Sequence, residues 1–273
     1  MKLRGSITQD EVKEISSKLP NIEFLVRTRP NLDAELVSRR FAHNPKFPVA
    51  GTCLSGAIST LAECRFAVYE ANAHRIWYES HANEIEYADL YGLYTARFFC
   101  DDAALRLYAV GEYLAEAIII LLGINKKHLE RQKNASLQNR VGEYLRTKFP
   151  NHVFTRYVGD LLESDEWRQA RDYRDRWVHG QPPLIEGLGR QFKRQTRWVR
   201  LTDSEIAEWQ TIYPDFGTGA KIGMSVTGLG DKPELTIDDL LGDVRGALFA
   251  VSALTEKLVS YFFEMIESQD KLI

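Results

Sequence analysis

Arg174, Asp175 and His179 are spaced along one short segment and have side chains suited to phosphodiester chemistry. An arginine guanidinium keeps its positive charge and donates a planar fork of hydrogen bonds, which suits it to a phosphate group. Histidine is the side chain that titrates closest to neutral pH, so an imidazole can act as a general acid or base. These residue types predict a site that binds a phosphate group and moves protons at it.

Helix geometry limits how the three side chains can meet. Five residues of an α-helix turn through about 500°, so Arg174 and His179 lie roughly 140° apart around the axis. They can converge only near the end of the helix. Asp175 and His179 are four residues apart and share a face, which predicts that the carboxylate orients the imidazole.

The same segment also permits a purely structural interpretation. Arg171 with Asp175, and Asp172 with Arg176, have the spacing of i, i+4 ion pairs. His179 would then only cap the end of a helix. In this interpretation the segment is a charged helix surface without chemistry of its own.

Arg174, Asp175 and His179 spell R-D-x-x-x-H, which resembles the signature of the HEPN superfamily: Arg, a polar residue, three further residues and His. The resemblance extends to the run of predicted helices over residues 84–267. It implies a helical bundle and a metal-independent endoribonuclease that acts as a homodimer with two facing motifs. In that chemistry the 2′-hydroxyl of RNA attacks the adjacent phosphate and leaves a 2′,3′-cyclic phosphate, a step that DNA cannot make.

The resemblance also implies residue roles. His179 would exchange protons with the 2′-hydroxyl or the leaving 5′-oxygen, Arg174 would stabilise the developing charge, and Asp175 would orient the site. Proteins of this superfamily often carry an acidic residue on an earlier helix near the motif arginine, and Glu112 and Glu116 match that place. A local salt bridge or a solvent-facing position is the alternative for either carboxylate.

Other interpretations remain open beside the ribonuclease. A HEPN-like bundle without cleavage activity would bind a nucleotide, RNA or a protein partner, and an unrelated helical protein would do neither. A toxin or phage-defence role, with an antitoxin or other regulatory protein as partner, is also compatible with the resemblance. Gln181 replaces the tyrosine that some toxin members carry. Arg75 and His81 form a second Arg and His pair, but Ile76 replaces the polar residue, which favours an ordinary helix end.

Charge is unevenly distributed along the chain. The net charge is −3, yet residues 125–200 contain 17 Lys and Arg against 9 Asp and Glu. This predicts a localised polyanion site, although solvated helix faces would give the same pattern. Cations alternate with aromatic residues in 190–200, which suits single-stranded nucleic acid but also suits aromatic rings that pack on the helical body. The expected RNA contacts are Arg171, Arg176, Lys193, Arg194, Arg197 and Trp198.

Composition places the chain among globular proteins. Its 273 residues are 44% hydrophobic and 27% charged. The basic start of the N-terminus runs into polar sequence, so we expect no secretory signal, and no apolar run suggests a membrane span. Cys53, Cys64 and Cys100 are widely spaced, which predicts reduced thiols in a cytoplasmic protein and argues against a zinc site. We expect no metal and no cofactor.

The hydrophobic pattern predicts a mainly α fold, a HEPN-like helical bundle with a small β-containing insertion near 187–233. We expect a helical N-terminal region, residues 1–83, packed on a helical domain of residues 84–273. The insertion should hold strands at 190–201 and 221–227 around a short helix at 203–212. Helices are expected at 8–18, 31–42, 55–78, 126–149, 153–178 and 237–267, with two more between 84 and 123 that meet near Asp101 and Asp102.

Overall fold

The computed structural model describes residues 7–33, 37–38, 44–82, 91–129, 135–179, 183–188, 192–200, 202–212, 221–229 and 233–270. The chain is mainly α-helical. It divides into two units, of which the first comprises Met1–Pro183 and Leu235–Ile273 and the second Leu184–Glu234. The predicted N-terminal region, residues 1–83, belongs to the first unit, and the predicted insertion falls within the second.

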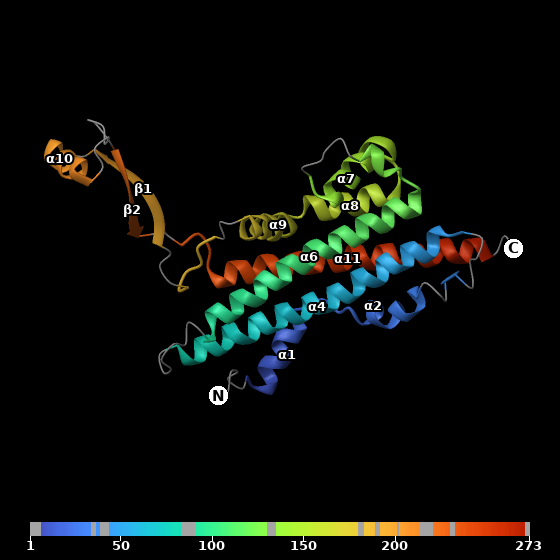
Figure 1. Cartoon of the computed structure of the whole chain (residues 1–273). Coiled ribbons are helices and arrows are strands. Elements are labelled where there is room, and N and C mark those ends of the chain that lie inside the picture. The colour runs from blue at the N-terminus through green and yellow to red at the C-terminus, as the bar shows by residue number, and fades with distance from the viewer. Residues whose placement is uncertain are drawn as a thin grey trace. The chain divides into compact units, whose positions relative to one another are not determined.

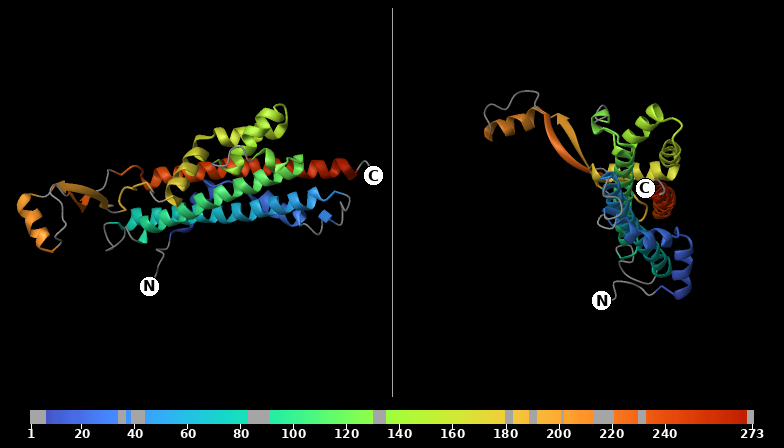
Figure 2. Two further views of the ribbon diagram at one scale, coloured as in Figure 1. Left: turned by 45° about the horizontal axis from the view of Figure 1, so that its top comes forward. Right: turned by 90° about the vertical axis from the view of Figure 1, so that its right-hand side faces the viewer.

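Three long helices form the centre of the first unit: α4 (Lys46–His81), α6 (Leu93–Leu122) and α11 (Ile237–Asp270). They run side by side, and each packs against the other two (Figures 1 and 2). Small buried side chains along α4 and α6 allow these two helices to approach closely, as where the Cys64 thiol lies 3.5 Å from the Ala103 carbonyl oxygen. The buried alanines include Ala57, Ala67, Ala71, Ala96, Ala103 and Ala117.

Shorter helices cover this centre on two sides. One group packs on α4 and consists of α1 (Gln9–Ser17), α2 (Glu23–Thr28) and the 3₁₀ helix η1 (Arg29–Leu32). The other group packs on α6 and α11 and consists of α7 (Leu137–Lys148), α8 (Val153–Glu163) and α9 (Asp165–Val178). A 3₁₀ turn, η2 (Lys126–His128), follows α6. The segment that carries the R-D-x-x-x-H motif is α9.

The second unit contains two strands and one helix. Strand β1 (Phe192–Arg200) pairs antiparallel with β2 (Lys221–Leu229), with Phe192 opposite Leu229 and Arg200 opposite Lys221. Helix α10 (Asp203–Ile212) lies between them in the sequence. The sequence analysis expected strands at 190–201 and 221–227 and a helix at 203–212 in this part of the chain.

Two helices at the chain's ends agree with their sequence signals. Thr8 begins α1 as a capping box: its hydroxyl accepts a hydrogen bond from the Glu11 N–H (3.3 Å), and the Glu11 carboxylate accepts one from the Thr8 N–H (2.6 Å). Helix α11 extends the predicted 237–267 by three residues. Its stretch Ile237–Ser268 is long and apolar enough to cross a membrane, but half of its most apolar window is buried in the fold, as in a core helix.

The predicted break at Asp101 and Asp102 is wrong, because α6 runs through both residues without interruption. Neither carboxylate caps a helix. Asp101 lies 3.8 Å from the Arg97 guanidinium, and Asp102 accepts a hydrogen bond from Arg106 at 2.7 Å. Both are i, i+4 ion pairs within the helix, which stabilise a continuous helix.

The single helix predicted for 153–178 is also wrong, because Ser164 separates α8 from α9. Ser164 has an extended backbone (φ −64°, ψ 130°), and its hydroxyl accepts a hydrogen bond from the Trp167 N–H at 3.2 Å. Asp165 and Glu166 then occupy the first turn, where acidic side chains suit the helix dipole. A polar cap without Gly or Pro is therefore enough to turn the chain here.

Other predicted boundaries also need correction. The loop predicted at 44–51 ends early, because α4 begins at Lys46 and holds Pro48 in its first turn, where no backbone N–H is needed. Asn31 lies inside η1 and does not cap a helix, and most of the predicted helix 31–42 lies outside the described residues. The helix predicted for 126–149 is replaced by η2 and α7, and residues 130–134 between them also lie outside the described part.

Gly51 shows how tightly α4 is covered. A Cβ atom at this position would lie 2.9 Å from the backbone carbonyl oxygen of Leu32 in η1. Backbone cannot move aside as a flexible side chain can. We expect Gly51→Ala to lower the free energy of unfolding by about 1–3 kcal/mol, although alanine favours a helix.

The matched control is Gly159→Ala in α8, where a Cβ atom would meet no heavy atom within 4 Å. This variant should raise the free energy of unfolding by about 0.5–1 kcal/mol, because only the helix preference of alanine acts there. Chemical denaturation of both variants measures the difference. Equal shifts of the same sign would contradict the close contact at Gly51.

The seam between α9 and α11 brings carboxylates together. Burial, together with the negative charges of Asp239 and Glu166, raises the pKa of Asp243 on α11 to about 6. Because the unfolded carboxyl titrates near about pH 4, the folded state binds the extra proton between these values. Stability from this group is therefore greatest below pH 4 and is lost as the pH rises through 6.

Asp243→Asn should remove this pH dependence. At pH 7 the variant should be more stable than the wild type by roughly 1 kcal/mol after allowance for solvent screening, and at pH 4 the difference should shrink. Thermal unfolding at both pH values, with Asp160→Asn on α8 as a control, measures this. A difference that grows toward pH 4 would contradict the assignment.

Candidate functional site

Helix α9, which carries the motif, packs on the central helices by one buried face. Trp167, Ala170 and Tyr173 recur every three residues and are buried against the central helices. Arg174 follows Tyr173 and is drawn partly inward, with 20% of its side chain exposed. Arg174 therefore belongs to an interface between helices.

The Arg174 guanidinium is held in a defined position. Its central carbon lies 4.0 Å from the centroid of the Tyr108 ring on α6, a cation–π contact. Its Nη1 donates a hydrogen bond to the Asp175 carboxylate at 2.7 Å. Its Nε is buried and has no hydrogen-bond partner among the described residues. Arg174 thus combines a fixed orientation with an unused donor.

Glu112 connects α6 to α7 beside this arginine. Its carboxylate accepts a hydrogen bond from the Leu137 N–H, at the first residue of α7, at 3.0 Å. Burial raises the pKa of Glu112, while hydrogen bonds from the backbone of Leu137 and Gln138 and the charges of Arg140 and Arg174 oppose that rise. Glu112 therefore holds the start of α7 on α6 and brings Arg140 into the same electrostatic environment as Arg174.

Buried polar atoms without a partner gather at this junction of α6, α7 and α9. Within the described part of the chain they belong to four residues: Gln138, Arg140, Trp167 and Arg174. Trp167 and Gln138 meet over Gly111 of α6, where a Cβ atom would lie 3.0 Å and 3.5 Å from them. An unpaired buried polar group costs about 1–3 kcal/mol. Each such group calls for an explanation, such as a catalytic role or a bound water or ion.

A second polar contact fixes α9 on α6. The Tyr173 hydroxyl donates a hydrogen bond to Asp101, whose side chain is 12% exposed and also faces Arg97. Burial raises the pKa of Asp101, and burial together with the Asp101 charge raises the pKa of Tyr173. The sequence analysis missed this pair, although Arg97 and Asp101 at i, i+4 spacing mark a polar position on an apolar helix.

His179 lies at the C-terminal end of the motif helix. It ends α9, its N–H donates to the Asp175 carbonyl at 3.0 Å, and its side chain is exposed. The Asp175 carboxylate binds Arg174, and its predicted role in orienting the imidazole stays a prediction. A regular helix places Arg174 and His179 about 140° apart around its axis.

Arg171 has other partners than the Asp175 carboxylate that the structural interpretation gave it. Arg171 donates to the carboxylate of its neighbour Asp172 (3.1 Å) and to the Asn139 side chain on α7 (3.4 Å). Asp175, the predicted partner of Arg171, binds Arg174. Arg171 therefore lies on the side of α9 that faces α7, and Arg176 is exposed.

The remaining predicted residues lie elsewhere. Glu116 pairs with Lys126 at 2.6 Å, so the structure brings Glu112 but not Glu116 to the junction. Lys193, Arg194, Arg197 and Trp198 lie on β1 in the second unit, and their side chains are outside the described part, as is Gln181.

The second Arg and His pair has structural partners. Arg75 binds Asp238 of α11 at 2.6 Å and also binds Glu79. His81 is the last residue of α4, with its Nδ1 2.8 Å from the Trp77 carbonyl oxygen and its ring stacked on Trp77. The prediction of an ordinary helix end is confirmed.

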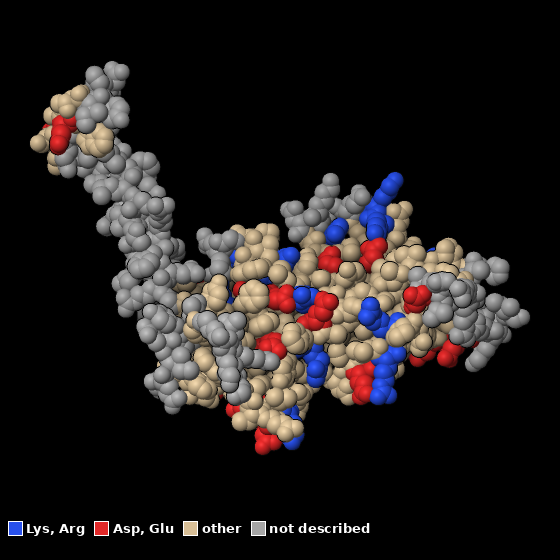
Figure 3. Space-filling view, turned by 60° about the horizontal axis from the view of Figure 1, so that its bottom comes forward, with Lys and Arg blue, Asp and Glu red and all other residues tan. Residues whose placement is uncertain are grey.

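Charge on the surface is mixed on the face that Figure 3 shows, where acidic and basic side chains lie in small neighbouring groups. In the described part of the chain no three His, Cys, Asp or Glu side chains gather in a way that could hold a metal ion. Burial raises the pKa of the Cys64 and Cys100 thiols, which keeps both protonated at neutral pH. No family model, curated protein or solved structure matches the chain.

Tyr173→Phe tests how α9 is fixed. Loss of the hydroxyl would leave the Asp101 carboxylate buried with Arg97 as its remaining partner, so the free energy of unfolding should fall by about 1–3 kcal/mol. The control is Tyr94→Phe on α6, the helix that carries Asp101. The Tyr94 side chain is exposed, so this variant should change the free energy of unfolding little. Urea denaturation at pH 7 measures both. An unchanged stability in Tyr173→Phe would rule out the hydrogen bond as a determinant of the seam.

Proposed function

We propose that the protein is a metal-independent endoribonuclease of the HEPN type that acts as a homodimer in the cytoplasm. The observation that carries the proposal is the state of Arg174. Its guanidinium is fixed by Tyr108 and Asp175, its Nε is buried without a partner, and Arg140 beside it has an unpartnered Nε as well. Two arginines with unused donors suit a phosphate group.

The proposed chemistry uses the nucleophile of the substrate. The 2′-oxygen of RNA forms a bond to phosphorus, the bond from phosphorus to the 5′-oxygen breaks, and a 2′,3′-cyclic phosphate remains. The imidazole of His179 accepts the 2′-hydroxyl proton, and the imidazolium so formed gives this proton to the leaving 5′-oxygen. Arg174 stabilises the negative charge that develops on the phosphate oxygens.

In this proposal the second copy of the chain brings a histidine close to the arginine of the first. His179 is exposed at the end of α9, and a regular helix places it about 140° from Arg174 around the axis. In the proposed dimer, His179 of one copy approaches the phosphate held by Arg174 of the other. The finer fold assignment, a HEPN-like bundle with a β-containing insertion, is part of the same proposal.

A second candidate function is RNA binding without cleavage. It is favoured by Asp175, whose carboxylate neutralises Arg174 and leaves the imidazole of His179 without that orienting partner. This candidate predicts saturable RNA binding that yields no product and is insensitive to His179→Ala. A pH profile of cleavage that follows a single histidine-like group would favour the enzyme.

Arg174→Ala and His179→Ala should each lower RNA cleavage at least about 100-fold, because one removes charge stabilisation and the other proton transfer. Labelled single-stranded RNA is incubated in excess EDTA and the product ends are identified. Arg168→Ala, a change of an exposed arginine on the same helix, is the control and should keep wild-type activity.

Mixing the two inactive variants tests the composite site. A mixed dimer contains one intact Arg174 and one intact His179 that face each other, so activity should return to a measurable fraction of the wild type. No recovery, in a mixture shown to exchange subunits, would contradict the site formed by two copies. Wild-type activity in both single variants would overturn the proposed function.

A further inference from the structure

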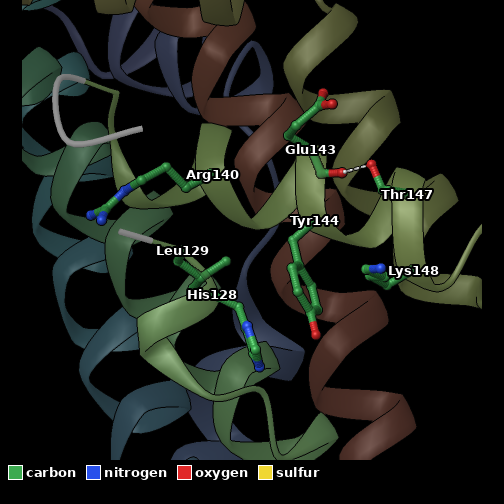
Figure 4. Close-up of a pocket in the computed structure, with 7 residues that line it drawn as sticks. All are labelled: His128, Leu129, Arg140, Glu143, Tyr144, Thr147 and Lys148. Atoms are coloured by element: carbon green, nitrogen blue, oxygen red, sulfur yellow. Dashed lines mark hydrogen bonds between the residues drawn. The ribbon is translucent and has the colours of Figure 1, made fainter. Parts of the chain in front are cut away.

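A cavity of about 650 Å³ lies between η2 and α7. Its described lining consists of His128, Leu129, Arg140, Glu143, Tyr144, Thr147 and Lys148 (Figure 4). The volume falls in the range of small-molecule sites. Its lining combines rings with cations, unlike a purely apolar packing defect.

The pattern of α7 produces this lining. Arg140, Tyr144 and Lys148 are spaced at i, i+4 and i+8, so they form one stripe along the helix. With a rise of about 1.5 Å per residue, each cation is rooted roughly 6 Å from the tyrosine along the axis. Figure 4 shows Tyr144 between Arg140 and Lys148, with the Glu143 carboxylate directed away from the tyrosine ring.

The tyrosine ring is held by neighbouring rings. Tyr144 stacks with His128 at 6.2 Å between centroids and 20° between planes, and it lies 6.1 Å from Phe149. Tyr144 is half-buried, whereas His128 is exposed. A ring that is fixed in this way loses little freedom when a planar base stacks on it.

Arg140 connects the cavity to the Arg174 junction. Arg140 is one of the residues that line the cavity, and its Nε is buried without a partner among the described residues. Its charge acts on Glu112 and Tyr108, the same groups on which Arg174 acts. A strand that binds at Arg174 can therefore continue along α7.

We propose that this cavity holds one nucleotide of the single-stranded RNA, with its base stacked on Tyr144 and its flanking phosphates at Arg140 and Lys148. This site rests on the proposed function, since it assigns part of the path of the same substrate. Cations on both sides of one ring match a nucleotide within a strand, which has a phosphate on each side. A free nucleoside monophosphate has a phosphate on one side only.

A labelled single-stranded DNA oligonucleotide measures this site without cleavage, because it lacks the 2′-hydroxyl while the stacking and phosphate contacts remain. Tyr144→Leu should weaken binding about tenfold, and Tyr144→Phe should bind as the wild type does. Lys148→Gln should reduce the slope of log affinity against log salt by about 0.7, whereas Lys148→Arg should keep it. Tyr94→Leu and Lys13→Gln, changes at exposed residues elsewhere, are the matched controls.

The outcomes separate this inference from the proposed function. Wild-type binding that is unchanged in Tyr144→Leu and Lys148→Gln, with folding verified by circular dichroism, overturns the cavity site and leaves the ribonuclease intact. Absence of binding to both RNA and DNA by the wild type overturns both. Competition by adenosine monophosphate as effective as that by the oligonucleotide overturns the strand assignment in favour of a free nucleotide.

Discussion

The burial of α6 is the constraint on which the rest of the first unit depends. This helix contacts α4, α7, α9 and α11, so most of its circumference is covered by protein. Polar side chains on such a helix must find partners inside the fold. Asp101 binds Tyr173 of α9, Glu112 binds the backbone of α7, and Tyr108 lies against Arg174. These three contacts join the covering helices to the centre and define the candidate site.

Periodicity predicted the elements whose apolar residues recur without interruption. The pattern in α11 shows Leu240, Val244, Leu248 and Val251 at three- and four-residue spacing, and these side chains are buried. It could not locate the break at Ser164, because the apolar pattern continues across it and the turn depends on one hydroxyl and one backbone N–H. Asp101 and Asp102 misled in the opposite direction: an aspartate that could cap a helix in the sequence forms a side-chain ion pair when a suitable arginine lies one turn away.

The candidate site also contains residues that the sequence could identify and residues that it could not. Arg174 could be identified from its spacing to His179, since both lie on one helix. Tyr108 and Arg140 could not, because they come from α6 and α7 and meet Arg174 only through tertiary packing. The contact between Asp175 and Arg174 could not be predicted, because i, i+4 spacing points to His179. Arg174 is adjacent in sequence and partly buried, so it has a strong need of a counter-ion.

The unpartnered atoms at the junction of α6, α7 and α9 indicate whether this junction serves packing alone. An arginine at a purely structural position should have its donors satisfied by the fold. If they are not satisfied, an apolar residue of similar shape would be as stabilising or more so. Arg140 and Arg174 each keep a buried Nε without a partner, and Arg140 also borders the cavity on α7. The glutamate between them is engaged by the backbone of α7. The position of this carboxylate is therefore fixed, and part of its hydrogen-bonding capacity is used by the backbone. The two guanidinium groups remain able to bind an anion from solvent.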